Sequence, residues 1–259
     1  MTHPATTERI SGPLLFSWYA HPPNQLGYCG PVDHRAFLEA AADGSDVRTL
    51  AHMALEFDGA LPYLDLIARC NGMDDFLDYR VVEAYWIGND LLDQVGRRAM
   101  MAMVEERFSA LAGLRIHTVT AAATKGVAHH SFHVLAAYPW IGLLRSGIKE
   151  PSIQVMDGCR ISWGRVVAVQ GDTVLVSRRP LVFDGIALAL GDEQIFPARY
   201  SVARASLIDH LVVGDLVALH WGWICDRLSR SSCVWLRRCT EANLRAVNAI
   251  STPEDLMHA

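Results

Sequence analysis

The sequence lacks several features that would place it in a specialised class of protein. It contains six cysteines but no Cys-x-x-Cys pair, so neither a zinc ribbon nor a disulfide framework is expected. No window approaches the roughly 18 uninterrupted apolar residues of a membrane helix. The first residues also lack the basic-then-apolar order of a signal peptide. These absences predict a cytoplasmic protein that does not enter a membrane and keeps its thiols reduced.

A surplus of positive charge is missing as well. The formal net charge is −5, with 12 Lys and Arg against 17 Asp and Glu in residues 1–150 and 11 of each in residues 151–259. Nucleic-acid binding needs a basic face, so nucleic acid is excluded as a partner. The 51% of hydrophobic residues and 20% of charged residues are typical of a folded chain. A length of 259 residues allows two modest domains.

Helical spacing dominates the first part of the chain. After a polar leader of about ten residues, the segment 18–31 is dense in proline, glycine and aromatic residues, which predicts an irregular loop rather than a helix. From His34 onward apolar residues recur at intervals of three and four, as in Phe37, Leu38 and Ala41. Further helical segments are predicted near 47–58, 61–71, 79–95, 97–111 and 127–145. Residues 1–150 are therefore predicted to form a mainly α-helical domain.

The pattern changes to short Val-rich runs after residues 147–151, where helix-stopping residues cluster. Strands are predicted at 164–169, 173–177, 182–190, 195–200 and 216–220, and helical spacing returns over 226–248. Several short strands separated by turn signals at this spacing predict a small barrel. The sequence thus predicts an α+β protein, in which residues 151–259 form a small OB-like β-barrel with a C-terminal helix.

Two short motifs lie in this second part. One is CRISWGRVVAV, which begins at Cys159, and the other is GDLVALHWG, which begins at Gly214. Together they resemble the HypC/HupF-type family of [NiFe]-hydrogenase maturation chaperones over about residues 159–248. That family has a cysteine five residues before a glycine and a strand, and later a Gly-Asp turn, a strand and His-x-Gly. The matching residues are Cys159, Gly164, Gly214, Asp215, His220 and Gly222.

The resemblance implies a chaperone that carries an Fe(CN)2(CO) group on its cysteine from a HypD-type maturation protein to the hydrogenase large-subunit precursor. Cys159 would bind and transfer the iron, and His220 would orient or deprotonate the thiol, because thiolate is a soft donor for low-spin iron. Cys159 is therefore expected at the surface of the barrel's edge, close to His220. The chain departs from the family in two ways: the family cysteine is N-terminal whereas Cys159 is internal, and Trp163 replaces a proline.

The first part of the chain offers a second set of metal-ligating residues. His129 and His133 are four residues apart, a spacing that places both on one helix face and can hold a metal. The glutamate and third ligand of zinc-protease motifs are missing, so a packing role is the alternative. Cys29, in the segment YCGP, supplies another thiol. The patterns AxPPNxLGYCGP and HHSFHVxxxYPW indicate that this domain belongs to an uncharacterised bacterial family.

Three functions remain open at this point. The leading hypothesis is a non-enzymatic maturation chaperone or scaffold that binds accessory or precursor proteins. The alternative is a metal-dependent enzyme whose site is formed by Cys29, His129 and His133. In the third, the chain is a protein-binding module in which both motifs serve only the architecture of the barrel.

Overall fold

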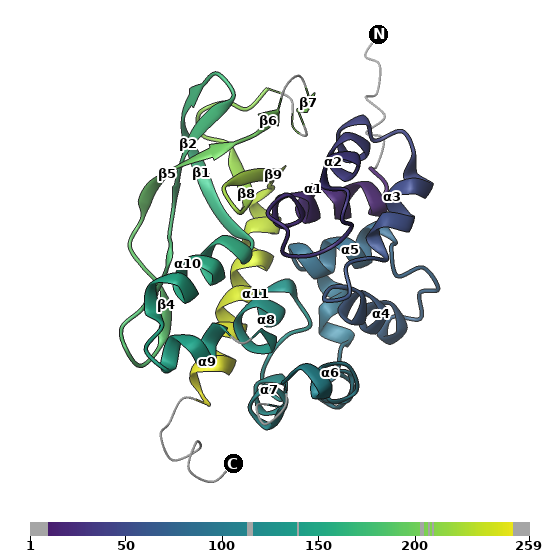
Figure 1. The fold of residues 1–259 in the computed structure, drawn as a ribbon, viewed down its shortest axis with the longest axis vertical. Helices are drawn as coiled ribbons and strands as arrows, with labels where there is room; N and C mark the ends of the chain where they lie inside the picture. Colours follow the sequence, from purple (N-terminus) through teal and green to yellow (C-terminus); the bar gives the residue numbers. More distant parts are fainter. Residues whose placement is uncertain are drawn as a thin grey trace.

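A set of helices, a β-barrel and a final helix follow one another along the chain (Figure 1). The computed structural model describes residues 10–112, 116–138, 140–202, 205–206, 208 and 210–250. Nearly all of the predicted polar leader lies outside these ranges. The α+β fold predicted from the sequence is confirmed, with a helical N-terminal region, a small sheet and a C-terminal helix.

The N-terminal helices are short, and aspartate side chains begin several of them. Asp33, Asp46 and Asp78 each accept a hydrogen bond from a backbone N–H of the first helical turn. The elements of this part are α1 (Gly12–Gln25), α2 (His34–Asp43), α3 (Val47–Ala54), α4 (Leu61–Cys70), α5 (Tyr79–Trp86), η1 (Asp90–Gln94), α6 (Arg97–Ala112), α7 (Ile116–Ala123), α8 (His130–Phe132), η3 (His133–Ala137), α9 (Trp140–Arg145) and α10 (Lys149–Cys159).

Helix α1 corrects the prediction of an irregular loop over residues 18–31, because it continues to Gln25 through Pro22 and Pro23. A proline inside a helix leaves the carbonyl four residues earlier without its usual donor. The carbonyl of Trp18, opposite Pro22, accepts instead from Nδ1 of His21 at 3.0 Å. The helix tolerates the prolines because side chains satisfy the carbonyls that they leave free.

The transition from helix to strand also differs from the prediction. The sequence predicts that residues 147–151 end the helical part, but α10 starts at Lys149 and runs to Cys159. Pro151 lies in the first turn of this helix, where a backbone N–H has no intrahelical acceptor and its loss costs little. A proline that ends one helix and one that begins the next look alike in a sequence.

Five strands close into a barrel in the order β1-β2-β5-β9-β8, with β8 pairing back onto β1. Neighbouring strands are antiparallel except β5 and β9, which are parallel.

The single strand predicted over 182–190 is instead a separate hairpin of two strands. Its turn forms because Asp184 accepts hydrogen bonds from two backbone N–H groups, those of Ile186 and Ala187. The strands are β1 (Ser162–Gln170), β2 (Thr173–Arg178), β3 (Leu181–Phe183), β4 (Leu188–Leu190), β5 (Gln194–Arg199), β6 (Ser201–Val202), β7 (Ala205–Ser206), β8 (Leu216–His220) and β9 (Trp223–Arg227).

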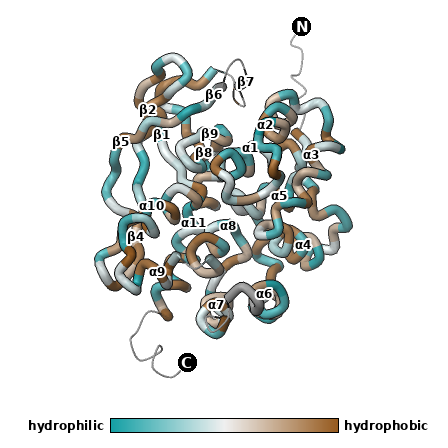
Figure 2. Tube along the Cα trace, in the orientation of Figure 1, coloured by the Kyte–Doolittle hydropathy of each residue, from teal (hydrophilic) through white to brown (hydrophobic). Residues whose placement is uncertain are grey.

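One hydrophobic core connects the helices with the barrel. It extends from α1 to α11 (Arg230–Asn248) and includes Ala218 of β8 and Cys225 of β9, while a smaller cluster of mainly valine and isoleucine fills the barrel itself. Figure 2 shows that hydrophobic stretches occur in both parts of the chain. Strands β8 and β9 thus pack against helix α1 (Figure 1). None of the described helices has the length and hydropathy required to cross a membrane.

Candidate metal centre

Three potential metal ligands from three different elements meet where the helices face the barrel. They are His130 in α8, Cys159 at the end of α10 and His220 at the end of β8, and one ligand atom of each lies within 4.8 Å of the other two. Both histidines are buried, with exposed fractions of 5% and 1%, and Cys159 is half-buried. Two imidazoles and a thiol at this separation form a donor set for a transition metal.

The orientation of His220 is fixed by helix α1. Its Nδ1 donates to the carbonyl oxygen of Tyr19 at 2.6 Å, and this carbonyl is available because Pro23, four residues later, has no N–H. A carbonyl only accepts, so the proton is on Nδ1 and the lone pair of the neutral ring is on Nε2. That Nε2 is buried and has no hydrogen-bond partner in the described part of the chain. Burial lowers the pKa of His220 to about 4, so the ring is neutral at pH 7.

His130 is hydrogen-bonded through both ring nitrogens. Its Nε2 donates to the carbonyl oxygen of Cys159 at 2.8 Å, and its Nδ1 accepts from the hydroxyl of Tyr85 at 3.1 Å. The ring centroids of His130 and His220 are 5.2 Å apart. Burial lowers the pKa of His130 well below its usual value, and the neighbouring imidazole of His220 lowers it further. Both imidazoles of the cluster are therefore neutral.

The thiol of Cys159 is protonated at neutral pH. Burial raises its pKa to about 12, the thiol of Cys29 contributes to the rise, and the indole N–H of Trp221 opposes it. A cysteine nucleophile needs a thiolate, usually beside an imidazolium, and this cluster has neither. A bound metal cation would supply the positive charge that stabilises a thiolate. The electrostatics therefore favour a metal ligand over a nucleophile.

Trp221 covers the cluster in a strained backbone conformation. Its φ of 50° is in the left-handed region, which is uncommon for a bulky residue and often marks functional sites. The indole stacks on Tyr28 with ring centroids 4.7 Å apart and planes 15° from parallel. A Cβ at position 158 would lie 2.7 Å from the indole, so Gly158 is needed for the close approach. These contacts hold an aromatic cover next to Cys159.

An inner pocket of about 280 Å³ lies beside the three ligands. Its walls are mostly aromatic and aliphatic, and they include all three members of the cluster. The lining residues are Ala20, Pro23, Tyr28, Cys29, Phe57, Gly59, Ala60, Tyr85, Trp86, His130, His133, Tyr138, Trp140, Val155, Cys159, His220 and Trp221. The ligands thus face a mainly apolar space rather than bulk water.

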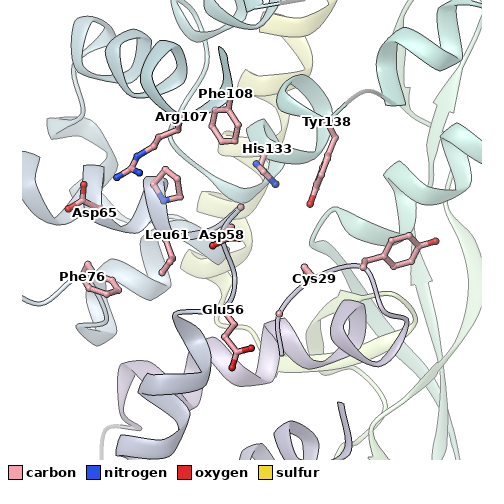
Figure 3. Close-up of a pocket in the computed structure, with 14 residues that line it drawn as sticks. Cys29, Glu56, Asp58, Leu61, Asp65, Phe76, Arg107, Phe108, His133 and Tyr138 are labelled. Atoms are coloured by element: carbon pink, nitrogen blue, oxygen red, sulfur yellow. The ribbon is translucent and has the colours of Figure 1, made fainter. Parts of the chain in front are cut away.

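An outer pocket of about 770 Å³ adjoins the inner one. Figure 3 shows the residues that line this outer pocket. The two pockets share the lining residues Tyr28, Cys29, Gly59, His133 and Tyr138. Figure 3 shows the side chains of His133 and Tyr138 directed into the outer pocket, whose walls also carry three carboxylates and one guanidinium. These charged side chains belong to Glu56, Asp58, Asp65 and Arg107. A charged vestibule therefore leads to an apolar interior.

The structure separates the two histidines that the sequence places on one helix face. Helix α8 begins only at His130, so His129 is its N-cap, and Nδ1 of His129 accepts from the backbone N–H of Ser131 at 3.0 Å. His129 lines neither pocket, whereas His133 and Cys29 line both. The helical spacing fails because the segment changes from a cap to a short helix and then to the π-helical turn η3.

Cys159 and His220, which the sequence pairs through distant motifs, do come together, but the thiol is half-buried in the inner pocket rather than exposed at the barrel's edge. His130 is the candidate ligand that the sequence does not reveal. It stands beside the spaced pair His129 and His133, and its contact with Cys159 depends on the packing of α8 against α10, which local spacing does not reveal.

The other residues of the two motifs have structural roles in the barrel. Gly214 and Gly222 have φ values of 102° and 75°, which favour glycine, and a Cβ on Gly164 would lie 2.4 Å from Val176. Asp215 accepts from the backbone N–H of Val212 at 3.0 Å and pairs with Arg227. A small closed barrel with such turns requires these residues irrespective of function.

Comparison with known proteins gives one match, to the model of a family described as a family of unknown function (DUF6390), over residues 8–254. No curated protein and no solved structure matches the chain. The match corrects the assignment to the HypC/HupF-type chaperones, for which no family match is found. The family match covers the helices and the barrel together. The two motifs therefore belong to a different family, in which their residues form turns of the barrel.

Proposed function

Because the chain belongs to the DUF6390 family, whose description assigns no function, we propose a function from its site: the protein binds one thiophilic transition-metal ion through His130, Cys159 and His220. The observation that carries this proposal is the buried Nε2 of His220, which has no hydrogen-bond partner among the described residues and lies beside a thiol and a second imidazole. Leaving such an atom buried without a partner costs free energy, and a metal ion would satisfy it.

The environment of His220 supports a role as a metal ligand. Ligating histidines usually donate their second ring N–H to a carbonyl or carboxylate, which fixes the tautomer and the ring orientation. The bond from Nδ1 to Tyr19 meets this requirement without any movement. His130 could ligate through Nε2 after a change of tautomer, in which Nδ1–H donates to the Tyr85 oxygen and the bond to the Cys159 carbonyl is lost.

One sulfur and two nitrogen ligands suit Zn²⁺, copper and Fe²⁺ rather than Mg²⁺ or Ca²⁺, which prefer oxygen. Three protein ligands leave a coordination position open, the arrangement typical of catalytic metal sites. That position would face the inner pocket, whose walls are mostly apolar. The burial of the ligands favours a resident ion and metal-dependent chemistry on a small molecule over a group that is passed to a partner protein.

Cobalt binding tests the proposal directly. Metal-free protein titrated with Co²⁺ under anaerobic conditions should bind one ion per chain and develop the absorption of a cobalt–thiolate bond. Cys159→Ser should abolish that absorption, and His220→Ala should weaken binding by at least tenfold. Cys233→Ser is the matched control, since this half-buried thiol on α11 lines neither pocket. If wild type binds no metal, or if Cys233→Ser behaves like Cys159→Ser, the proposal is wrong.

The carrier hypothesis can be tested on the same anaerobically purified protein. Infrared bands of CO and cyanide would support an Fe(CN)2(CO) cargo, whereas a stoichiometric metal without these bands would support a resident ion. The partnership with a hydrogenase precursor and a HypD-type protein stays a prediction. The resemblance to the HypC/HupF-type family, from which it came, is overturned by the family match. A protein without any bound or bindable metal would favour the third reading, a protein-binding module.

A further inference from the structure

The inner pocket has a composition that restricts what it can hold. None of its lining residues is an aspartate, glutamate, lysine or arginine, although the outer pocket carries four such side chains. A charged group that left water for this space would lose its hydration without gaining a charged side chain as partner. Seven of the lining residues are aromatic: Tyr28, Phe57, Tyr85, Trp86, Tyr138, Trp140 and Trp221.

We propose that the inner pocket binds a small, uncharged aromatic molecule of about two fused rings that carries one hydrogen-bond donor. This inference deepens the proposed function, because it names the class of substrate that would lie at the open coordination position. The pocket itself is formed by the protein alone, so that binding of the aromatic molecule can be measured without metal.

Volume sets the size of the ligand. A dry cavity of about 150 Å³ accommodates benzene. The inner pocket, at about 280 Å³, has nearly twice that volume and lies just below the range of about 300–1,000 Å³ typical of drug-sized ligand sites. Aromatic walls suit an aromatic ligand, because offset or edge-to-face ring contacts add to the effect of burial. A ligand of two fused rings fits these limits, whereas a nucleotide or a lipid chain does not.

The polar groups of the pocket set the position of the donor. In the metal-free protein the lone pair on Nε2 of His220 is an acceptor without a partner. Because this Nε2 is buried, a neighbouring side chain of the cluster has to rotate before a hydroxyl or ring N–H of the ligand can donate to it. The same end of the ligand would then lie next to Cys159 and His130. When a metal occupies the three ligands, this end of the molecule is the one that reaches the ion.

The stacked pair of Tyr28 and Trp221 lies on the route into the pocket. Tyr28 is 49% exposed and lines both pockets, whereas Trp221 lines the inner pocket next to His220. The ligand would pass from the charged outer pocket past Tyr28, Cys29 and His133.

Two probes of equal ring size test the proposal: 2-naphthol, which is neutral, and 2-naphthoate, which is charged. Metal-free wild type should bind 2-naphthol with quenching of tryptophan fluorescence, and 2-naphthoate at least tenfold more weakly. Val155→Phe should weaken naphthol binding at least tenfold, because Val155 is half-buried and lines the pocket. Ile153→Phe, on the same helix and also half-buried but in neither pocket, should bind as wild type does.

Several outcomes would overturn the inference: no naphthol binding by wild type, equal binding of both probes, or equal effects of the two variants. If Val155→Phe lowers the thermal midpoint, Val155→Leu makes the same test with a smaller change of volume. Cobalt binding is measured separately. Naphthol binding without cobalt binding would refute only the proposed metal site. Cobalt binding without naphthol binding would refute only the proposed aromatic ligand.

Discussion

The Nδ1 atom of His220 donates a hydrogen bond to the carbonyl oxygen of Tyr19, 201 residues earlier in the chain and 2.6 Å away. This bond joins the last residue of strand β8 to the middle of helix α1, at a carbonyl that Pro23 leaves without a helical donor. The proline therefore connects a local irregularity of a helix to the tautomer of a proposed metal ligand.

Replacing Pro23 tests this connection. Pro23→Ala restores a backbone N–H that competes with His220 for the Tyr19 carbonyl, so we expect Co²⁺ affinity to fall by about 10-fold to 100-fold, as is usual when a ligand loses its outer partner. Helix α1 should at the same time be stabilised. Pro22→Ala is the control, because the carbonyl opposite Pro22 accepts from His21 and not from a proposed ligand. Equal affinities of the two variants would contradict the role of Pro23.

The hydroxyl of Tyr85 should matter for metal binding and much less for folding. Tyr85→Phe removes the oxygen that would accept from Nδ1–H of His130 in the metal-bound tautomer, so we expect a loss of about 10-fold to 100-fold in Co²⁺ affinity. Tyr63→Phe is the matched control, since Tyr63 is equally buried and its hydroxyl has no hydrogen-bond partner within the described residues. If both variants bind Co²⁺ like wild type, His130 does not ligate through Nε2.

Acid should destabilise the metal-free protein. Burial lowers the pKa of His129 to about 3 and those of His133 and His220 to about 4, below the value of about 6.5 in an unfolded chain. The unfolded state therefore binds more protons below pH 6.5, and stability falls as the pH drops from there towards 4. The urea midpoint should be clearly lower at pH 5 than at pH 7. A midpoint that stays constant or rises would show that these rings are protonated in the folded state.

Asp226 should have the opposite pH dependence. Burial raises the pKa of its carboxyl to about 6, and the hydroxyl of Tyr19 donates to its Oδ2 at 3.3 Å. Because the folded-state pKa exceeds the unfolded value of about 3.9, the ionised carboxylate destabilises the fold above pH 6, and this cost disappears as the pH falls towards 4. Asp226→Asn should therefore raise the thermal midpoint at pH 8 more than at pH 5. An equal change at both values would argue against a raised pKa.

The sequence predicts the general fold because periodicity records which faces are buried. Alternating apolar residues in β1 and β2 and helical spacing in α11 are local signals, and the elements form where these signals lie. Strand β9 is missed because its five residues follow His220 so closely that they look like an extension of the motif. The prolines at 22, 23 and 151 mislead because their effect depends on which carbonyl or helical turn they face.

The candidate site is only partly visible in the sequence. Cys159 and His220 are identified through a resemblance that the family match overturns, yet the two residues meet because α10 ends beside the end of β8. His130 has no signal of its own, since its partners Tyr85 and Cys159 are 45 and 29 residues away. Contacts over such separations are set by tertiary packing, which periodicity does not encode.

The distribution of the ligands along the chain has a consequence for the order of folding. No single helix or strand holds the proposed site, because His130, Cys159 and His220 are on α8, α10 and β8 and the carbonyl that orients His220 is on α1. A metal ion would thus meet three correctly oriented ligands only after the barrel has docked onto the helices. Metal affinity would then report on native assembly, and two fragments cut between Cys159 and His220 would acquire the cobalt spectrum only after they are mixed and the native packing is restored.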